Sequence, residues 1–256
     1  MRNIVLNKYG SADVILAANV MCHIPDLKNI AEAASNVLNK NGLLIFEDPY
    51  LGDMIEKTSY DQIYDEHVYI FSAMSIKNIF GKYGFELINL LPQSTHGGSM
   101  RYILSKKGSY KAEKIVGEFL LKEKKMGLDS PKTYEKFRKN CEKSRNDLIK
   151  ILEEEKKNNN RVVAYGATSK STTILNYCKI GADLIEYISD TTPIKQNKFS
   201  PGMHIPVKNY SNFIEAPPDT TILFAWNHAE EIMEKENKYT KNGGKWIVHV
   251  PNVKKF

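Results

Sequence analysis

The chain has 256 residues, 42% of them hydrophobic, enough to bury one large core or two smaller ones. No apolar run reaches the roughly 18 residues of a membrane-spanning helix, and the N-terminus lacks the apolar core of a signal peptide, so a cytoplasmic protein without a membrane role is expected. The net charge of +6 suits an anionic ligand, but no motif of a nucleic-acid-binding protein accompanies it. The three cysteines form no CxxC pair, so neither a disulfide framework nor a metal site is expected.

The first predicted strand covers Asp13–Ala18, a short apolar run with β-branched residues. It ends at Asn19 and is soon followed by His23, which makes this strand end a candidate ligand-binding edge. A structural histidine is the alternative for His23. Asp26 is placed to cap a helix over Leu27–Leu38, whose apolar residues follow the helical period.

The next predicted strand, Leu43–Glu47, leads into a polar, tyrosine-rich stretch from Glu47 to Phe71. His67 lies there among several acidic side chains and phenols. An imidazole has an unperturbed pKa of about 6.5, so it can transfer protons near neutral pH. The stretch is therefore a candidate catalytic segment, and a surface loop with hydrogen-bonded tyrosines is the alternative.

A short helix over Ser75–Tyr83 and two strands, Phe85–Leu91 and Arg101–Ser105, are expected next. Gly97-Gly98 marks the turn of an apparent antiparallel pair. Two helices, Ser109–Leu128 and Pro131–Lys157, then form a bridge, and their lysines predict solvated faces.

A second α/β pattern begins with the strand Val162–Tyr165, followed by a turn from Gly166 and a helix ending at Cys178. A strand over Leu184–Ser189 ends at Asp190. The remaining expected elements are strands at Ile205–Val207, Thr221–Trp226 and Trp246–Val250, and a helix over Ala229–Tyr239. This order predicts a small doubly wound, Rossmann-like domain.

The turn after Val162–Tyr165 matches neither standard phosphate-binding motif. A P-loop needs glycines where Ser169 and Ala164 stand, and a dinucleotide fingerprint needs three glycines where only Gly166 is present. Free amides and hydroxyls at a helix N-terminus still suit a phosphate, and an ordinary capped βα turn is the alternative. The candidate ligands of this turn are Gly166, Thr168, Ser169, Lys170 and Ser171. Asp190 lies near the spacing of a ribose-binding acid, and three weaker candidates are Lys195, Asn197 and Asn227.

Several long motifs in this order resemble the nucleotide-sugar C-methyltransferases. They are AANVMCHIP, FEDPYLGDMIEKTSYDQIYDEHVYIFS, GFEL, HGGSMRY, YGATSKSTT, DTTPIKQNKFSPGMHIPV and FAWNHAEEIMEKE, so the resemblance covers nearly the whole chain. It implies that the first half is the later part of a class I, S-adenosylmethionine-dependent methyltransferase domain. It also implies methylation of C3 of a nucleotide-linked 4-keto-deoxy sugar.

The sequence departs from the family at its beginning. Family members start with a cysteine-ligated zinc module and a glycine-rich loop with an acidic residue that holds S-adenosylmethionine, and neither is found here. The chain therefore resembles a truncated member, whether a fragment, a mis-called start or half of a split gene. The methyl-donor site is expected to be incomplete, with Ala18 and Asn19 as its remaining contacts.

The resemblance implies a role for each candidate residue. His67 would be the base that forms an enolate from the keto sugar, and Tyr64 and Glu66 would orient it or hydrogen-bond the enolate oxygen. Asn19 and His23 would face the same pocket, and the second domain would hold the nucleotide.

Three domain ranges follow: a partial methyltransferase domain at 1–107, a helical bridge at 108–158 and a nucleotide-sugar-binding domain at 159–256. The alternative function is a catalytically incomplete module that binds a nucleotide sugar. A Rossmann oxidoreductase is a third possibility, opposed by the missing glycines.

Overall fold

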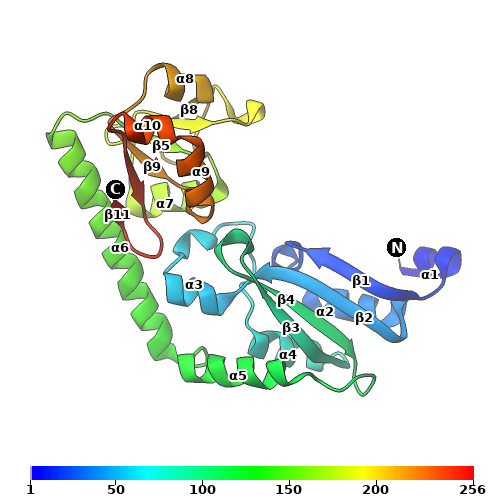
Figure 1. The fold of residues 1–256 in the computed structure, drawn as a ribbon. Coiled ribbons are helices and arrows are strands. Elements are labelled where there is room, and N and C mark those ends of the chain that lie inside the picture. Colours follow the sequence, from blue (N-terminus) through cyan, green and yellow to red (C-terminus); the bar gives the residue numbers. More distant parts are fainter. Residues whose placement is uncertain (1) are drawn as a thin grey trace. The chain divides into compact units, whose positions relative to one another are not determined.

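A computed structural model describes residues 2–256 (Figure 1). The chain divides into two compact units. Unit 1 comprises the residues up to Ile55 together with Asp65–Glu135, and unit 2 comprises Glu56–Tyr64 together with Lys136–Phe256. A short part of the tyrosine-rich stretch thus belongs to unit 2, although unit 1 flanks it on both sides. The domain ranges inferred from the sequence stay predictions.

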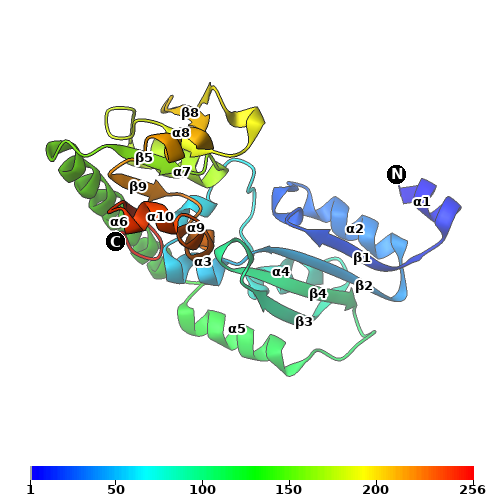
Figure 2. The ribbon, with the colours of Figure 1, turned by 45° about the horizontal axis from the view of Figure 1, so that its top comes forward.

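Within residues 2–256, unit 1 contains a four-stranded sheet in the order β1-β2-β4-β3 (Figure 2). The strands are β1 Ala12–Ala18, β2 Leu38–Pro49, β3 Phe85–Gln93 and β4 Ser99–Lys106. β1 pairs with β2 in parallel, and β4 pairs antiparallel with both β2 and β3, which confirms the predicted antiparallel pair. β2 is longer than expected because its pairing with β4 continues to Pro49 opposite Ser99.

Among the described residues, the helices of unit 1 include the three predicted from the sequence, with different ends, and four that were not predicted. The helices are α1 Arg2–Tyr9, η1 Met21–His23, α2 Leu27–Val37, α3 Leu51–Lys57 (whose last two residues belong to unit 2), α4 Ala73–Gly81, η3 Thr95–Gly97 and α5 Lys114–Met126. Asp26 caps α2 as predicted, since its carboxylate accepts the Asn29 N–H at 2.9 Å. α4 begins earlier than expected because Ser72 and Ser75 form a reciprocal capping box.

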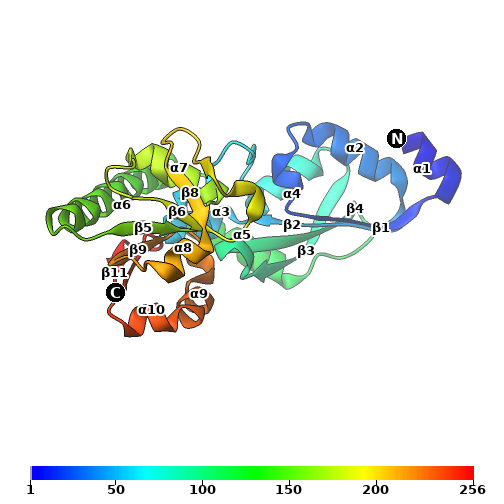
Figure 3. The same cartoon turned by 90° about the horizontal axis from the view of Figure 1, so that it is seen from above.

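Side-chain alternation along β2 buries one face of the unit 1 sheet. Leu44, Phe46 and Asp48 point into the core, while Leu43, Ile45 and Glu47 are only half-buried. α2 lies on one side of β1 and β2 and packs its buried Ala31 and Ala34 into the same core (Figure 3). β1 is an edge strand and leaves Leu16 74% exposed.

Among the described residues, unit 2 contains a seven-stranded sheet in the order β11-β10-β9-β5-β6-β8-β7. Its strands are β5 Val162–Tyr165, β6 Ile188–Asp190, β7 Lys198–Phe199, β8 Pro206–Asn209, β9 Thr220–Leu223, β10 Lys245–Val248 and β11 Lys254–Lys255. β5 lies at the centre and pairs in parallel with β6 and β9, as a doubly wound domain requires.

Helices cover both faces of this sheet. They are η2 Tyr60–Gln62, α6 Pro131–Lys157 (which begins in unit 1), α7 Ser169–Cys178, η4 Pro193–Lys195, α8 Tyr210–Glu215, η5 Trp226–His228, α9 Ala229–Lys235 and α10 Asn237–Lys241. α6 and α7 lie on one side of β5 and β9, and α8, α9 and α10 lie on the other (Figure 3). The second face is aromatic, because Tyr165 packs there against Phe213 and Trp246.

Several elements of unit 2 are shorter in the structure than the sequence predicted. The strand expected over Leu184–Ser189 starts only at Ile188, because Leu184 and Ile185 direct their N–H groups back to the Gly181 carbonyl in a turn. The expected helix over Ala229–Tyr239 is broken at Glu236, which is buried. The predicted strands ending at Trp226 and Val250 stop at Leu223 and Val248. Over residues 2–256, no helix combines the length and hydrophobicity that crossing a bilayer requires.

Candidate functional site

The end of β1 places Asn19 at the carboxyl edge of the unit 1 sheet. The Asn19 N–H donates to the Glu47 carbonyl at 2.7 Å, so the parallel pairing of β1 and β2 continues to this point. Asn19 has a left-handed φ of 53°, which Asn adopts more readily than most residues. Its side-chain oxygen is buried and has no hydrogen-bond partner among the described residues, and Ala18 beside it is exposed. The sheet edge therefore offers an unsatisfied polar acceptor.

The turn after β1 brings His23 to His67. Cys22 and His23 lie on η1, and the Tyr69 N–H donates to the Cys22 carbonyl at 3.1 Å. The Tyr69 hydroxyl also donates to the Pro25 carbonyl at 2.7 Å, which fixes the segment after His67 beside this turn. The two imidazole rings consequently meet edge to face, with centroids 5.1 Å apart.

A buried carboxylate lies beside these rings. Asp48 is 0% exposed, and neither of its oxygens has a hydrogen-bond partner among the described residues. Burial raises the pKa of the Asp48 carboxyl, and the neighbouring Cys22 thiol offsets part of that rise. Burial likewise raises the pKa of the Cys22 thiol. Cys22, His23, Asp48 and His67 together are called the histidine cluster below.

Glu47 and Asp48 are neighbours in sequence but not in environment. Strand alternation turns Glu47 to the opposite face of the sheet, where Arg101 donates from Nε and Nη2 to one carboxylate oxygen at 3.1 and 2.8 Å. The Thr95 hydroxyl donates to the other oxygen at 2.9 Å. Both carboxylate oxygens of Glu47 thus have partners. The alternation of side chains along β2 is the sequence signal that could have predicted different environments for Glu47 and Asp48.

The other two residues expected around His67, Tyr64 and Glu66, belong to different units. Glu66 is exposed on unit 1, and Tyr64 is half-buried and belongs to unit 2. Their roles in orienting the base stay predictions.

In unit 2, β5 leads into the βα turn, which is Gly166–Ser171. Gly166 has a φ of +93°, which favours glycine, and its N–H donates to the Ser189 carbonyl at 2.9 Å. Asp190 is buried at the end of β6 and accepts the Ala167 N–H and the Thr192 N–H, each at 2.7 Å. The carboxylate therefore holds two backbone segments together at the carboxyl edge of the sheet.

The hydroxyls of the βα turn cap α7. The Ser171 N–H donates to the Thr168 hydroxyl at 3.0 Å, and the Thr168 N–H donates to the Ser171 hydroxyl at 2.9 Å. This is a reciprocal capping box, as the capped-turn alternative from the sequence described. Ser169 is exposed beside it. The capping box fixes the start of α7 without excluding a ligand at its exposed backbone.

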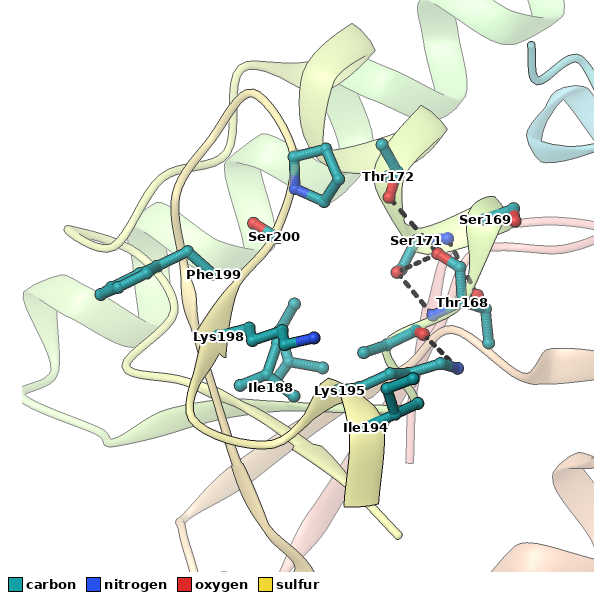
Figure 4. Close-up of a pocket in the computed structure, with 13 residues that line it drawn as sticks. Thr168, Ser169, Ser171, Thr172, Ile188, Ile194, Lys195, Lys198, Phe199 and Ser200 are labelled. Carbon is teal, nitrogen blue, oxygen red and sulfur yellow. Dashed lines mark hydrogen bonds between the residues drawn. The ribbon is translucent and has the colours of Figure 1, made fainter. Parts of the chain in front are cut away.

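A pocket of about 340 Å³ opens next to the βα turn (Figure 4). Lys195 and Lys198 line it, and the Lys198 ammonium points across the hollow toward Thr168 and Ser171. Lys195 donates to the Ala167 carbonyl at 2.8 Å and lies 3.7 Å from the Asp190 carboxylate. Two cations facing a helix start suit an anionic ligand. Sequence reasoning missed Lys198, which no motif distinguishes from the many other lysines.

A second pocket of about 540 Å³ is lined by Gly166 and Asp190 and shares Thr168 and Lys195 with the first. Its polar groups include the ring hydroxyls of Tyr165 and Tyr210, which both donate to the buried Glu236, at 2.9 and 2.7 Å. Burial, followed by the Glu236 carboxylate, raises the pKa of Tyr210 to about 12. Neither tyrosine was expected here from the sequence.

Lys170 and Asn227 meet in a buried network. The Lys170 ammonium lies 3.4 Å from the Asn227 side-chain oxygen and 5.0 Å from the centre of the Trp226 ring. The Trp226 indole N–H donates to Asp61 at 2.6 Å, and His249 lies 3.5 Å from the same oxygen. Burial lowers the pKa of Lys170, whereas burial of Asp61 is outweighed by its contacts with His249, Lys170 and Trp226 together, which lower the pKa of that carboxyl. Lys170 thus has partners inside unit 2, and its contact with phosphate stays a prediction.

Asn197 is the remaining candidate. It is exposed, has a φ of 61°, and donates its backbone N–H to the Val207 carbonyl at 2.9 Å. This contact holds the hairpin of β7 and β8, and its role toward a ligand stays a prediction.

Comparison with known proteins identifies the family of the chain. The family model described as "C-methyltransferase C-terminal domain" matches residues 94–251, which is more than half of the chain, and the model described as "Methyltransferase domain" matches residues 2–90. The chain belongs to the C-methyltransferase family. Along the chain, the histidine cluster falls in the first matched segment, and the βα turn with both pockets falls in the second.

A characterised relative agrees with the family. C-methyltransferase NovU of Streptomyces niveus is 29% identical over 248 residues, which are 96% of this chain and 59% of NovU. The chain thus spans about 59% of the length of that relative.

Two solved structures show weaker likeness. One, titled "The structure of LepI complex with SAM", is 13% identical with a TM-score of 0.32, over 38% of this chain and 27% of that chain. Another, of M1.HpyAVI, is 13% identical with a TM-score of 0.26, over 41% of this chain and 49% of that chain. Scores this low do not indicate a shared fold, so the assignment rests on the family models.

Proposed function

We propose that this C-methyltransferase takes part in the S-adenosylmethionine-dependent methylation of a nucleotide-linked 4-keto-deoxy sugar, at the carbon next to the ketone. The observation that carries the proposal is the meeting of His23 and His67, 5.1 Å apart between ring centroids, at the carboxyl edge of a sheet in a chain of this family. Such an edge is the usual ligand-binding edge of open α/β sheets.

His67 is the proposed base. It takes the proton from the carbon next to the ketone, and the electron pair of the broken C–H bond passes into the enolate. His23 lies close enough to stabilise the charge that develops when His67 gains the proton. S-adenosylmethionine would supply an electrophilic methyl group to the enolate carbon. Tyr64 and Glu66 are proposed to orient the base or to hydrogen-bond the enolate oxygen.

Asn19 fits a contact with the methyl donor. Its side-chain oxygen is buried without a partner among the described residues, so a donor group of a ligand would satisfy it. Ala18 beside it is exposed and small, which leaves room for a ligand at the same edge.

The nucleotide end of the substrate is assigned to unit 2. Lys195 and Lys198 line the 340 Å³ pocket beside the start of α7, where the positive end of the helix and two cations favour phosphate oxygens. Asp190 ties the βα turn to the segment after β6 by accepting the N–H groups of Ala167 and Thr192, so it supports the pocket as a positioning residue. The backbone of Ser169 would contact the diphosphate, because the N–H groups of Gly166 and Thr168 already donate to the Ser189 carbonyl and the Ser171 hydroxyl.

Proton exchange tests this function without the methyl donor. The chain is incubated in deuterated water with a thymidine-diphosphate 4-keto-6-deoxyhexose, and deuterium at the carbon next to the ketone is followed by mass spectrometry. The proposal expects exchange well above the rate without protein. Binding of the sugar nucleotide with no exchange would favour the alternative of a binding module that lacks catalysis.

A further inference from the structure

The histidine cluster has the composition of a metal site. The Cys22 sulfur and one nitrogen each of His23 and His67 all lie within 4.8 Å of one another. Cys22 is buried and the two histidines are half-buried, so the donors converge below the surface of unit 1. Thiolate and imidazole are the donors that Zn²⁺ and related late transition metals prefer.

Asp48 is an independent sign that a cation belongs here. A carboxylate that is 0% exposed normally has hydrogen-bond or charged partners, yet neither Asp48 oxygen makes a hydrogen bond of normal geometry among the described residues, and the adjacent Cys22 thiol is only a weak donor. It lies beside the Cys22 thiol and within electrostatic reach of His23. A cation bound to the neighbouring donors would balance its negative charge.

We propose that Cys22, His23 and His67 bind one divalent transition-metal ion of the zinc class, with Asp48 as the charge-balancing group. One thiolate and one carboxylate carry two negative charges, which equal the charge of the ion. On binding, a bond forms between the metal and the Cys22 sulfur, and the thiol proton is released to solvent. The site then holds no net charge, which is the condition for burial.

The geometry needs only a small adjustment. Zinc bonds of about 2.3 Å to sulfur and about 2.0 Å to nitrogen, in a tetrahedral arrangement, put ligand atoms about 3.5 Å apart. The three donors therefore have to approach by about 1 Å, which side-chain rotation of two half-buried histidines can provide. The hydrogen bond from the Tyr69 N–H to the Cys22 carbonyl keeps the two backbone segments in register.

Spacing could not reveal this site, because it uses one cysteine and two histidines that are 44 residues apart in sequence. The absence of a CxxC pair led to the expectation of no metal site, and the donor set shows how that expectation can fail. Cys141 and Cys178 take no part, since both belong to unit 2.

Metal binding and proton abstraction exclude one another at His67. A ring nitrogen bound to zinc cannot accept the proton of a substrate, so the metal-bound form would be inactive in the proposed reaction. The metal site itself does not depend on that reaction, and its test measures binding.

Cobalt(II) is the probe. The chain is treated with a chelator, freed of it, and titrated with Co²⁺ while the absorption spectrum is recorded. One equivalent is expected to give the visible bands of a tetrahedral ion and a near-ultraviolet thiolate-to-cobalt band. Cys22→Ser should remove the thiolate band, and Cys141→Ser, a matched change of another buried cysteine, should leave it. His67→Gln and His23→Gln should each weaken Co²⁺ binding at least tenfold, and Asp48→Asn by about tenfold or more.

X-ray absorption on the zinc-loaded, unsubstituted chain covers the case in which a variant fails to fold. The proposal expects one sulfur and at least two nitrogen ligands. A shell of oxygen and nitrogen without sulfur, no Co²⁺ binding at micromolar concentration, or a thiolate band that survives Cys22→Ser would each overturn it.

Discussion

The polar groups of the two candidate sites differ in how they are held. In unit 1, Asp48 and the Asn19 side-chain oxygen are buried without a hydrogen bond of normal geometry among the described residues. In unit 2, Asp190 beside the βα turn accepts two backbone N–H groups, whereas away from that turn one oxygen of Asp61 and both ring nitrogens of His249 are also buried without partners. Both sites lie near the ends of strands that pair in parallel, β1 with β2 in unit 1 and β5 with β6 in unit 2, so the strand arrangement alone does not explain the difference.

The difference separates chemistry from binding. Buried groups without partners cost stability, and they persist where a ligand or a reaction uses them. Groups that already hold the backbone in place give a rigid cradle, which suits recognition of a constant part such as a diphosphate. The comparison is the basis for proposing that the reacting carbon lies at the histidine cluster and the nucleotide at the βα turn.

His67→Ala is expected to have the largest effect. Loss of a general base typically lowers a rate by about 10²–10⁴-fold, so deuterium exchange next to the ketone should fall by at least that range. Affinity for the sugar nucleotide should stay nearly unchanged, because the imidazole contributes to the transition state and not to the ground state. His204→Asn is the control, since His204 is exposed in unit 2 and Asn tolerates its φ of 53°. Exchange at the original rate in His67→Ala would move the role of base to His23 or Tyr64.

Asp61→Asn tests the partnered acid of unit 2. It leaves the buried Lys170 without its negative neighbour, so the free energy of unfolding at pH 7 should fall by about 3 kcal/mol. The folded pKa of Asp61 is lowered, so its stabilisation is present above the unfolded value of about 3.9 and is lost as the pH falls through the folded pKa. Urea unfolding should show the gap between the two proteins closing below about pH 4.

The matched control is Asp183→Asn, which removes only an exposed ion pair with Lys156. Its effect should stay under about 1 kcal/mol. Equal losses in both variants would mean that the network around Asp61 is not what stabilises unit 2.

Lys195→Ala should weaken binding of a nucleoside diphosphate about tenfold, equal to about 1.4 kcal/mol. The ammonium is partly exposed and lines the 340 Å³ pocket, so it contributes one charge-assisted contact and little to folding. Calorimetric titration at two salt concentrations measures the affinity, and Lys238→Ala, an exposed lysine on α10, is the control. An unchanged affinity would place the diphosphate outside this pocket.

Leu16→Ala is expected to have the smallest effect. Leu16 is 74% exposed on the edge strand β1, so its loss should change the free energy of unfolding by less than about 0.5 kcal/mol. The same change at Leu44, which is 1% exposed in the neighbouring strand, should cost about 2–5 kcal/mol. A large effect at Leu16, measured by urea unfolding, would show that another surface covers this edge in solution.

Local pattern was enough to predict most elements. β5 and α6 have the predicted bounds, and Asp26 caps α2 as expected, because propensity, period and capping are all written in neighbouring residues. Glu236 shows the limit of this approach. The helical pattern around it is continuous, but long-range hydrogen bonds from Tyr165 and Tyr210 meet it where the helix breaks.

The sites were harder to predict than the secondary structure, because they depend on contacts between residues that are far apart in the sequence. The sequence grouped Tyr64 with His67, yet the first belongs to unit 2, where the preceding Tyr60 and Asp61 contact Ser144 and Trp226. The proximity of His23 to His67 agrees with the pocket expected from the sequence, although their roles stay predictions. Cys22 and Asp48 could not be recognised, because only the folded turn puts the thiol beside the carboxylate.

The central claim is that the histidine cluster carries out the chemistry and the βα turn binds the nucleotide. Its most direct test is the dependence of deuterium exchange on substrate concentration, measured for the unsubstituted chain, His67→Ala and Lys195→Ala. The account predicts that His67→Ala lowers the rate at saturation at least 10²-fold with little change in the half-saturating concentration. It predicts that Lys195→Ala raises the half-saturating concentration about tenfold and leaves the saturated rate nearly unchanged. The opposite pattern, a lower saturated rate from Lys195→Ala and weaker binding alone from His67→Ala, would contradict it.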